Sequence, residues 1–399
     1  MNASTRTFSC LSLPATLLAV VLAAMLTASH ANAVPITPMS DDEVIEVLPA
    51  ATANRTEARR QRQQLTRQPR DAGLALTMAR GYLDQAHATG DPRYAGLAMA
   101  AISGWADEAT MPDAVLLMRA VLLQYLHEFD AAARSLARLL ARPAVEPRPQ
   151  AWLTLATVRR VQGRYAESDV ACRQVGAGGA ALLHANACLA ENAALRGDVD
   201  RARATFTGLL ATARNAAPAT QAWLLTSLAE LEQRAGRPAA AEVAFQSSIK
   251  LEQDPYAQLS YADFLIEQRR PAQAIALLKG QVRSDAVLLR LAIAGKQAHA
   301  PTAVADAAEM RERIALANER PDARVFHGRE QAMFALHVEG RVEPALELAR
   351  GNVAQQREPL DLLVLAQAAR AAADPAALKA VKRLTQEIGL HDQRVDALL

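Results

Sequence analysis

The segment Pro149–Val175 reads PQAWLTLATVRRVQGRYAESDVACRQV, and its pattern predicts two short helices joined by a tight turn. Apolar and small residues recur three and four positions apart on both sides of Gly163, which is the spacing of one face of an α-helix. Glycine at the break can take the left-handed backbone conformation that commonly ends a helix. The segment therefore predicts an antiparallel helical hairpin.

The same hairpin pattern recurs along most of the chain. Breaks between paired helices are predicted at nine positions: Gly90, His127, Gly163, Gly197, Gly236, Arg270, His299, Gly340 and Ala373. Consecutive breaks are 29 to 41 residues apart, about 35 on average, which indicates tandem repeats. In most units Ala or Ser early in the second helix is followed four positions later by another core position, so that the two helices can pack closely. In chain order these residues are Ala95 and Met99, Ala132 and Leu136, Ser168 and Cys172, Ala202 and Phe206, Ala241 and Phe245, Ala274 and Leu278, Val304 and Ala308, Ala345 and Ala349, and Ala377 and Val381.

On these positions the chain resembles the tetratricopeptide repeat family, whose repeat is 34 residues long. In the clearest unit, Trp152, Leu155 and Ala156 match the first helix of the family pattern, and Ser168 matches the second. The resemblance covers about residues 72–390. It implies an all-α, right-handed superhelical solenoid of about nine helix pairs, each stable only against its neighbours. The alternatives are an irregular helical domain rich in alanine and leucine, and repeats of the HEAT or Sel1 type.

The first 33 residues have the pattern of an export signal. Arg6 precedes an apolar run from Leu11 to Ala28, and Ala31-Asn32-Ala33 is a small-x-small cleavage pattern. We therefore predict a signal peptide at 1–33, cleavage after Ala33, and a periplasmic or secreted mature protein. The alternative is an uncleaved anchor, because the run is almost long enough to span a bilayer. No later stretch is long and apolar enough, so no membrane span is expected in the mature chain.

The remainder of the chain divides at changes in the repeat pattern. Residues 34–70 are predicted to be a linker and a capping helix, with the helix at Asn54–Gln68. Residues 71–142 form the N-terminal repeats and 148–390 the main array, because a proline-rich joint lies between them. Residues 391–399 are expected to be a C-terminal tail.

Two cysteines, Cys172 and Cys188, remain once the signal is removed. They lie on successive predicted helices, and an oxidising compartment would allow a disulfide that stabilises the fold by about 3 kcal/mol on a chain-entropy estimate. The alternative is a pair of buried thiols that pack as small hydrophobic side chains.

Composition and motifs argue against several functional classes. The formal net charge is +2, so neither nucleic acid nor an anionic membrane surface is implied as a partner. The sequence contains no Gly-x-Ser-x-Gly elbow, no phosphate-binding Gly-Lys-Ser/Thr loop, no His-Glu-x-x-His and no Cys-x-x-Cys. We therefore expect no enzyme activity, no cofactor and no metal site.

The family resemblance implies that first-helix residues line an inner surface. At one such position, three consecutive units carry a carboxylate, Glu191, Glu230 and Asp263, which we call the acidic row. Asp84 occupies a related place upstream, next to Leu83. The row predicts a groove that attracts a basic or amine-bearing peptide. The alternative is that these carboxylates only solvate an exposed face.

These observations favour an exported scaffold or adaptor that binds a partner protein or peptide along its inner groove. The alternative is a periplasmic assembly factor or chaperone in envelope biogenesis. Arg80, Gly81 and Asp84 do not match the carboxylate-clamp subfamily of the repeat, so recognition of a C-terminal carboxylate is not expected.

Overall fold

A computed structural model describes residues 53–91, 93–143, 146, 148–177, 179, 181–319 and 328–399. The predicted signal peptide and its cleavage site after Ala33 lie outside the described residues. The chain divides into two compact units, Met1–Arg59 and Arg60–Leu399. Of the first unit only the beginning of α2 (Ala53–Arg67) is described, so the architecture below is that of the second unit.

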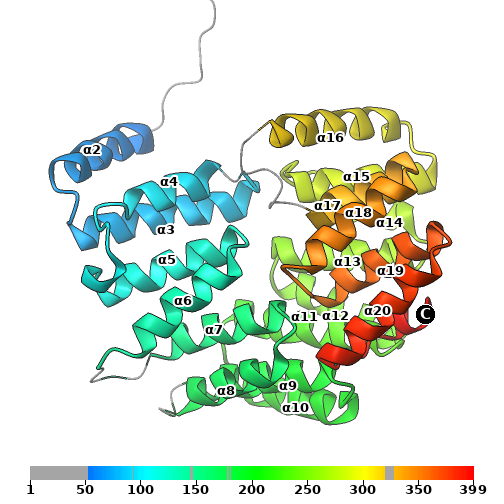
Figure 1. Ribbon diagram of the computed structural model, residues 1–399, viewed down its shortest axis with the longest axis horizontal. Helices are drawn as coiled ribbons and strands as arrows, with labels where there is room; N and C mark the ends of the chain where they lie inside the picture. Colours follow the sequence, from blue (N-terminus) through cyan, green and yellow to red (C-terminus); the bar gives the residue numbers. More distant parts are fainter. Residues whose placement is uncertain are drawn as a thin grey trace, which may run out of the picture. The chain divides into compact units, whose positions relative to one another are not determined.

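The described part of the second unit consists of helices and contains no strand (Figure 1). After α2, consecutive helices form nine antiparallel pairs, which confirms the predicted all-α repeat architecture. The pairs are α3 (Ala72–Thr89) with α4 (Arg93–Ala101), α5 (Asp113–Tyr125) with α6 (Phe129–Leu140), α7 (Pro149–Val161) with α8 (Tyr165–Gly176), α9 (Leu182–Leu195) with α10 (Val199–Thr212), α11 (Pro218–Arg234) with α12 (Pro238–Leu251), α13 (Pro255–Glu267) with α14 (Pro271–Leu278), α15 (Asp285–Ala298) with α16 (Ala303–Asn318), α17 (Gly328–Met333) and its π-helical continuation η3 (Phe334–Glu339) with α18 (Val342–Val353), and α19 (Pro359–Ala371) with α20 (Pro375–Ile388). The short helices η1 (Glu108–Thr110) and α21 (Gln393–Asp396) lie outside this pairing.

Residues with left-handed backbone end the first helix of each pair at the predicted breaks. Eight of the nine predicted residues have a positive φ, between 49° and 88°. The ninth prediction, Arg270, is wrong by one position, because Arg269 has a φ of 57° and Arg270 has a φ of −117°. Arg270 precedes Pro271, which disfavours helical backbone at the preceding residue. The left-handed conformation therefore falls on Arg269, two residues before α14 begins, as Gly163 does before α8.

The predicted small positions of the second helices are buried between the two helices of a pair. Most of them have no exposed surface: Ala95, Ala132, Ser168, Ala202, Ala241, Ala274 and Ala345. Phe206 and Phe245, four positions after Ala202 and Ala241, are also fully buried. The close approach expected from the sequence is thus present in these pairs.

The seventh pair departs from the predicted register. Val304 is 83% exposed and Ala308 is exposed, whereas Asp306 and Met310 are buried in their place. Ser168 lies five residues after the left-handed Gly163, but Asp306 lies seven residues after His299. The loop through Pro301 is therefore longer, and it moves the buried face of α16 along by two residues. The buried carboxylate of Asp306 is stabilised by Arg283, whose Nη2 donates to it at 3.0 Å.

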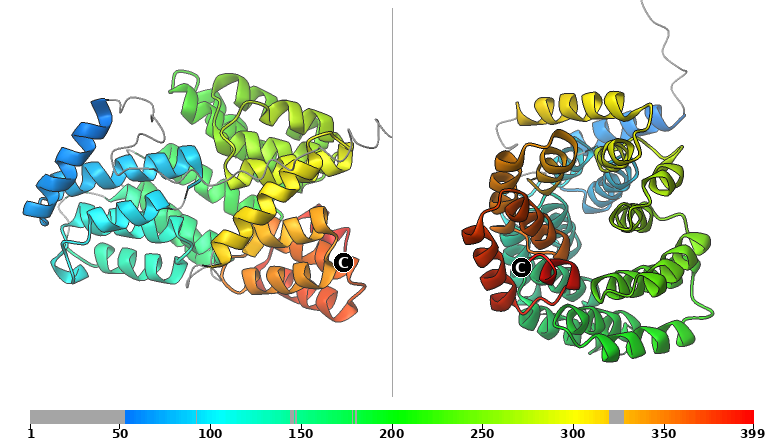
Figure 2. Two further views of the ribbon diagram at one scale, coloured as in Figure 1. Left: turned by 90° about the horizontal axis from the view of Figure 1, so that it is seen from above. Right: turned by 90° about the vertical axis from the view of Figure 1, so that its right-hand side faces the viewer.

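The end of the chain packs against the middle repeats. Residues 388–394, which we call the closing segment, cross the turns of three consecutive pairs. The backbone N–H of His391 donates to the carbonyl of Leu195 at 2.8 Å, and Arg394 Nη1 donates to Glu267 at 3.0 Å. Residues 391–399, expected to be a tail, therefore fold onto the array. In the right-hand view of Figure 2 the red C-terminal helices lie beside the green helices of the middle repeats.

Glycines at the crossed turns allow this close approach. A Cβ on Gly197 would lie 3.1 Å from the ring of His391, and one on Gly236 would lie 2.0 Å from Oε1 of Gln393. Both glycines also have positive φ, which L side chains rarely adopt. Glycine at these turns therefore serves both the hairpin and the docking of the closing segment.

Candidate partner-binding site

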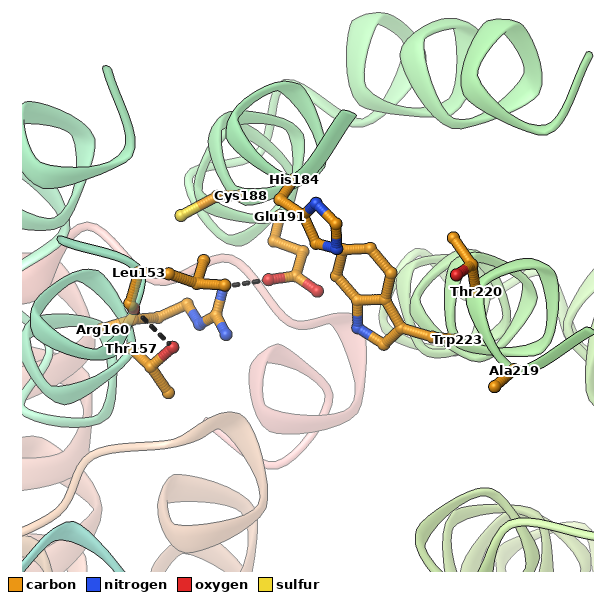
Figure 3. Close-up of a pocket in the computed structure, with 9 residues that line it drawn as sticks. All are labelled: Leu153, Thr157, Arg160, His184, Cys188, Glu191, Ala219, Thr220 and Trp223. Atoms are coloured by element: carbon orange, nitrogen blue, oxygen red, sulfur yellow. Dashed lines mark hydrogen bonds and ion pairs between the residues drawn. The ribbon is translucent and has the colours of Figure 1, made fainter. Parts of the chain in front are cut away.

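A cavity of about 380 Å³ lies on the inner face, which we define as the face formed by the first helices of the pairs. Its walls come from the first helices of three consecutive pairs, α7, α9 and α11 (Figure 3). The lining residues recur at helical spacing: Leu153, Thr157 and Arg160 on α7; His184, Cys188 and Glu191 on α9; and Ala219, Thr220 and Trp223 on α11. One face of each helix thus points into one space.

One wall of the cavity is aromatic. The rings of His184 and Trp223 stack with their centroids 5.5 Å apart and an interplanar angle of 20°. The stack joins α9 to α11, and the indole nitrogen of Trp223 points toward the space between it and Arg160 (Figure 3). A partner side chain therefore meets ring edges and the indole N–H on this side.

The opposite wall carries an ion pair. Arg160 Nη1 donates to Oε2 of Glu191, and both side chains are largely buried. Oε1 of Glu191 accepts a hydrogen bond of 2.8 Å from Ser227 on α11. Glu191 is therefore bonded to both neighbouring first helices, with each of its oxygens in use.

The other members of the acidic row repeat this arrangement on later helices. Oε1 of Glu230 accepts hydrogen bonds from Tyr256 (2.7 Å) and Ser260 (3.0 Å) of α13, and burial raises the pKa of Glu230. Asp263 accepts two hydrogen bonds, of 3.0 and 2.7 Å, from the buried guanidinium of Arg290 on α15.

The acidic row thus links successive first helices. Two of its three carboxylates, Glu191 and Asp263, are neutralised by an arginine of an adjacent pair. The predicted basic-peptide groove therefore has less free negative charge than the sequence alone indicates. Asp84 lies apart from the cavity on α3, where it is exposed and has no hydrogen bond or ion pair with any described residue.

Comparisons with known proteins place this geometry in a known fold. No protein-family model and no curated protein matches the sequence. Among solved structures, the chain is similar to a Rap protein complexed with Competence and Sporulation Factor, with a TM-score of 0.50 and 12% identity over 87% of this chain and 94% of that one. A tetratricopeptide repeat protein from Parabacteroides merdae ATCC 43184 matches with a TM-score of 0.37 and 14% identity, over 63% of this chain and 97% of that one. The APC/C hetero-tetramer Cut9-Hcn1 matches with a TM-score of 0.40 and 15% identity, over 79% of this chain and 60% of that one.

The likeness to the Rap protein extends over most of both chains, and it agrees with the period and turns described above. The chain has the tetratricopeptide-repeat fold.

Within this tetratricopeptide array, Cys172 and Cys188 form a disulfide. The S–S distance is 1.97 Å and the Cα–Cα distance is 5.7 Å, and the bond joins α8 to α9. Cys188 also lines the cavity, so the disulfide fixes the helix that carries His184 and Glu191. Beside it, Asn192 Nδ2 donates to the buried Ser168 Oγ at 2.9 Å.

The tetratricopeptide array has a larger cavity, of about 530 Å³, between the ends of α3 and α5 and helices α15 to α17. Residues 320–327, which lie between α16 and α17, are outside the described residues. We therefore place the candidate site at the cavity on α7, α9 and α11.

Of the nine residues that line the cavity, only Cys188 and Glu191 were predicted from the sequence as site or disulfide residues. The three whose chemistry defines the cavity, Arg160, His184 and Trp223, were not predicted. A signal for the aromatic wall was present: His184 and Trp223 each precede a member of the acidic row by seven residues. Seven residues are about two helical turns, which return to the same face. Tyr256 precedes Asp263 by the same interval.

The described residues show neither a metal site nor a membrane span. No group of three or more His, Cys, Asp or Glu side chains there could hold a metal ion. No helix in the described ranges is long and apolar enough to cross a membrane.

Proposed function

We propose that this chain is an exported scaffold that holds a partner protein by a segment bound across α7, α9 and α11. The cavity that these first helices share is the observation that carries the proposal. It combines an aromatic wall with polar groups fixed by neighbouring helices, and such sites anchor side chains of a partner with little loss of conformational entropy.

The position of the closing segment supports this choice of surface. The segment contacts the C-terminal ends of the first helices, at Leu195 and Glu267, and the turn at Gly236. No residue of the closing segment lines the cavity, and neither does any other described residue outside α7, α9 and α11. This half of the inner face is therefore available to a partner.

The comparison is consistent with a binding role. The Rap protein of similar fold is in a complex with Competence and Sporulation Factor. We carry over only the idea that a repeat array of this shape holds a partner.

Partner capture with a site variant tests the scaffold role. The wild-type protein, Trp223→Ala and a control, Val243→Ala, are immobilised and exposed to cell-envelope extract. Val243 lies on the second helix α12 and is 65% exposed, so the control changes a surface residue away from the cavity. We expect at least one protein to be retained by wild type and control and lost by Trp223→Ala. Equal retention by all three proteins would contradict the proposal, provided that circular dichroism shows equal helix content.

Export is tested separately, by fractionation and N-terminal sequencing. The pattern Ala31-Asn32-Ala33 leads us to expect a periplasmic or secreted protein that begins at Val34. A mature protein that retains residues 1–33 would instead support the membrane-anchored alternative.

A further inference from the structure

We propose that the cavity selects a partner segment that carries an acidic side chain, held by Arg160, next to an apolar or aromatic side chain. This inference rests on the proposed scaffold function, and it reverses the partner charge predicted from the acidic row.

Within the cavity, the carboxylate of the acidic row has little capacity left for a basic partner. Both oxygens of Glu191 are engaged, one by Arg160 and one by Ser227. Glu191 is also the row's only member that lines the cavity. An amine entering the cavity would have to compete with a guanidinium that is already in place.

The free hydrogen-bonding groups of the cavity are mainly donors. Arg160 uses Nη1 for Glu191, and its Nε and Nη2 donate to no described residue. The indole N–H of Trp223 likewise has no described acceptor. A guanidinium presents its N–H groups as a planar fork that fits a carboxylate, so an acidic side chain satisfies the donors that remain.

A second cation lies on the same inner face. Arg234, four residues after Glu230 on α11, forms no ion pair with any described residue, and its Nε is buried without a hydrogen-bond partner. The hydroxyl of Tyr165, a side chain that is only 3% exposed, also lacks a partner among the described residues. The Nε of Arg234 and the hydroxyl of Tyr165 are thus two further donors without a partner among the described residues.

The aromatic wall favours the same chemistry. His184 and Trp223 stack on each other, so one face of each ring is already covered. Ring edges carry partial positive charge, whereas a cation binds to a ring face. The wall thus suits an acceptor or an apolar side chain better than an amine, and Leu153 adds an apolar contact on the facing helix.

The acidic group is assigned to a side chain within an extended segment. The cavity runs across three first helices, and neighbouring packed helices are about 8–10 Å apart. At about 3.4 Å per residue, roughly six extended residues cross this span. A segment of that length can pass through the site with its carboxylate at Arg160.

Selection from a random peptide library tests the inference. Random dodecamers are displayed with their C-termini fused to the carrier, so that no free C-terminal carboxylate is presented, and are selected on the purified protein. Parallel selections use Trp223→Ala, Arg160→Gln and the control Arg201→Gln, whose side chain is 81% exposed on α10. The strongest binder is then synthesised with an amidated or a free C-terminus, and also with its acidic residue replaced by the amide isostere. Affinities are measured by calorimetry.

We expect Asp or Glu to be enriched within two residues of an apolar or aromatic residue. The amide isostere should bind about tenfold more weakly, as for loss of a charge-assisted hydrogen bond. Arg160→Gln should lower the affinity for the acidic peptide by a similar factor and leave the affinity for the amide isostere unchanged. Arg201→Gln should change neither affinity. Arg160→Lys, which keeps the charge near Glu191 but lacks the fork, should give an intermediate affinity and serves as the second variant if Arg160→Gln unfolds.

Four results would overturn the inference. Enrichment of Lys or Arg, or equal affinity for the acidic peptide and its amide isostere, would show that the partner segment is not recognised by an acidic side chain. If such peptides still lose binding to Trp223→Ala, the proposed scaffold function stands although this inference fails. If the peptide binds only with a free C-terminus and not when amidated, the recognised carboxylate is that of the chain end and not that of a side chain. A library with no peptide enriched over Trp223→Ala removes both this inference and the proposed site.

Discussion

A small residue early in the second helix sets how closely the two helices of a pair approach. Ala241 has no exposed surface and lies in a core with Ala229, Phe245 and Ala262. We predict that Ala241→Leu lowers the free energy of unfolding by about 1–3 kcal/mol, because the extra methyl groups overpack this core. Urea unfolding measures the effect. Val243→Leu, at an exposed position of the same helix, is the control and should unfold like wild type. An unchanged midpoint for Ala241→Leu would show that the register of this pair is wrong.

Burial of a carboxylate makes stability depend on pH. Burial raises the pKa of Glu230, which accepts hydrogen bonds from two hydroxyl groups and forms no ion pair with any described cation. Below the ordinary glutamate pKa the group is protonated in both states, so its contribution to stability is fully present. As the pH rises through the higher folded pKa this contribution is lost, because ionisation is easier in the unfolded chain.

We therefore predict that Glu230→Gln changes the pH dependence of stability. The free energy of unfolding of the variant, minus that of wild type, should increase from about pH 4 toward neutral pH. Urea unfolding at several pH values gives this difference. A difference that stays constant over the range would mean that Glu230 titrates normally in the folded protein.

At the scale of helices, the disulfide fixes α9 against α8. It closes a loop with a sequence separation of 16 residues, for which a chain-entropy estimate gives about 3 kcal/mol. We predict that dithiothreitol lowers the free energy of unfolding of wild type by about this amount. The double variant Cys172→Ala with Cys188→Ala should be less stable than oxidised wild type and should not respond to the reductant. If thiol titration shows full reduction while wild-type stability is unchanged, the disulfide has no stabilising role.

The helices and their turns could largely be predicted from the sequence, because both depend on local chemistry. Helical spacing and left-handed turn residues give eight of nine breaks, and the small positions fix the register of most pairs. The errors at Arg270 and Val304 also have local causes, namely a following proline and a longer loop.

The site was less predictable because it depends on contacts between pairs. The spacing identified Glu191, Glu230 and Asp263 as a row, but it gave no information on their partners. Arg160 reaches Glu191 from a helix 31 residues earlier, and Arg290 reaches Asp263 from 27 residues later. Only the stacking of pairs brings these groups together, and it leaves two of the three carboxylates in ion pairs with arginine.

At the scale of the whole described unit, the closing segment joins the last pairs to the middle pairs. Tyr165 and Leu195 share a hydrophobic core with Leu362, Leu390 and Val395, so the middle and last pairs bury apolar surface together. Arg394 donates hydrogen bonds to Glu267 and to Asp392, so charged side chains also hold the closing segment against the middle pairs. The array is thus stabilised by neighbour contacts and also by this contact between distant pairs.

An engineered cross-link tests this closure most directly. A Cβ on Gly197 would lie 3.5 Å from the Cβ of His391, at the short end of the range for a disulfide. We predict that the double variant Gly197→Cys with His391→Cys forms an intramolecular disulfide on mild oxidation. In protein that begins at Val34, and so lacks Cys10, it should show faster migration on non-reducing gels and no free thiol, whereas each single variant keeps one. If both introduced thiols of the folded double variant stay free and migration is unchanged, the closing segment does not dock on the middle repeats.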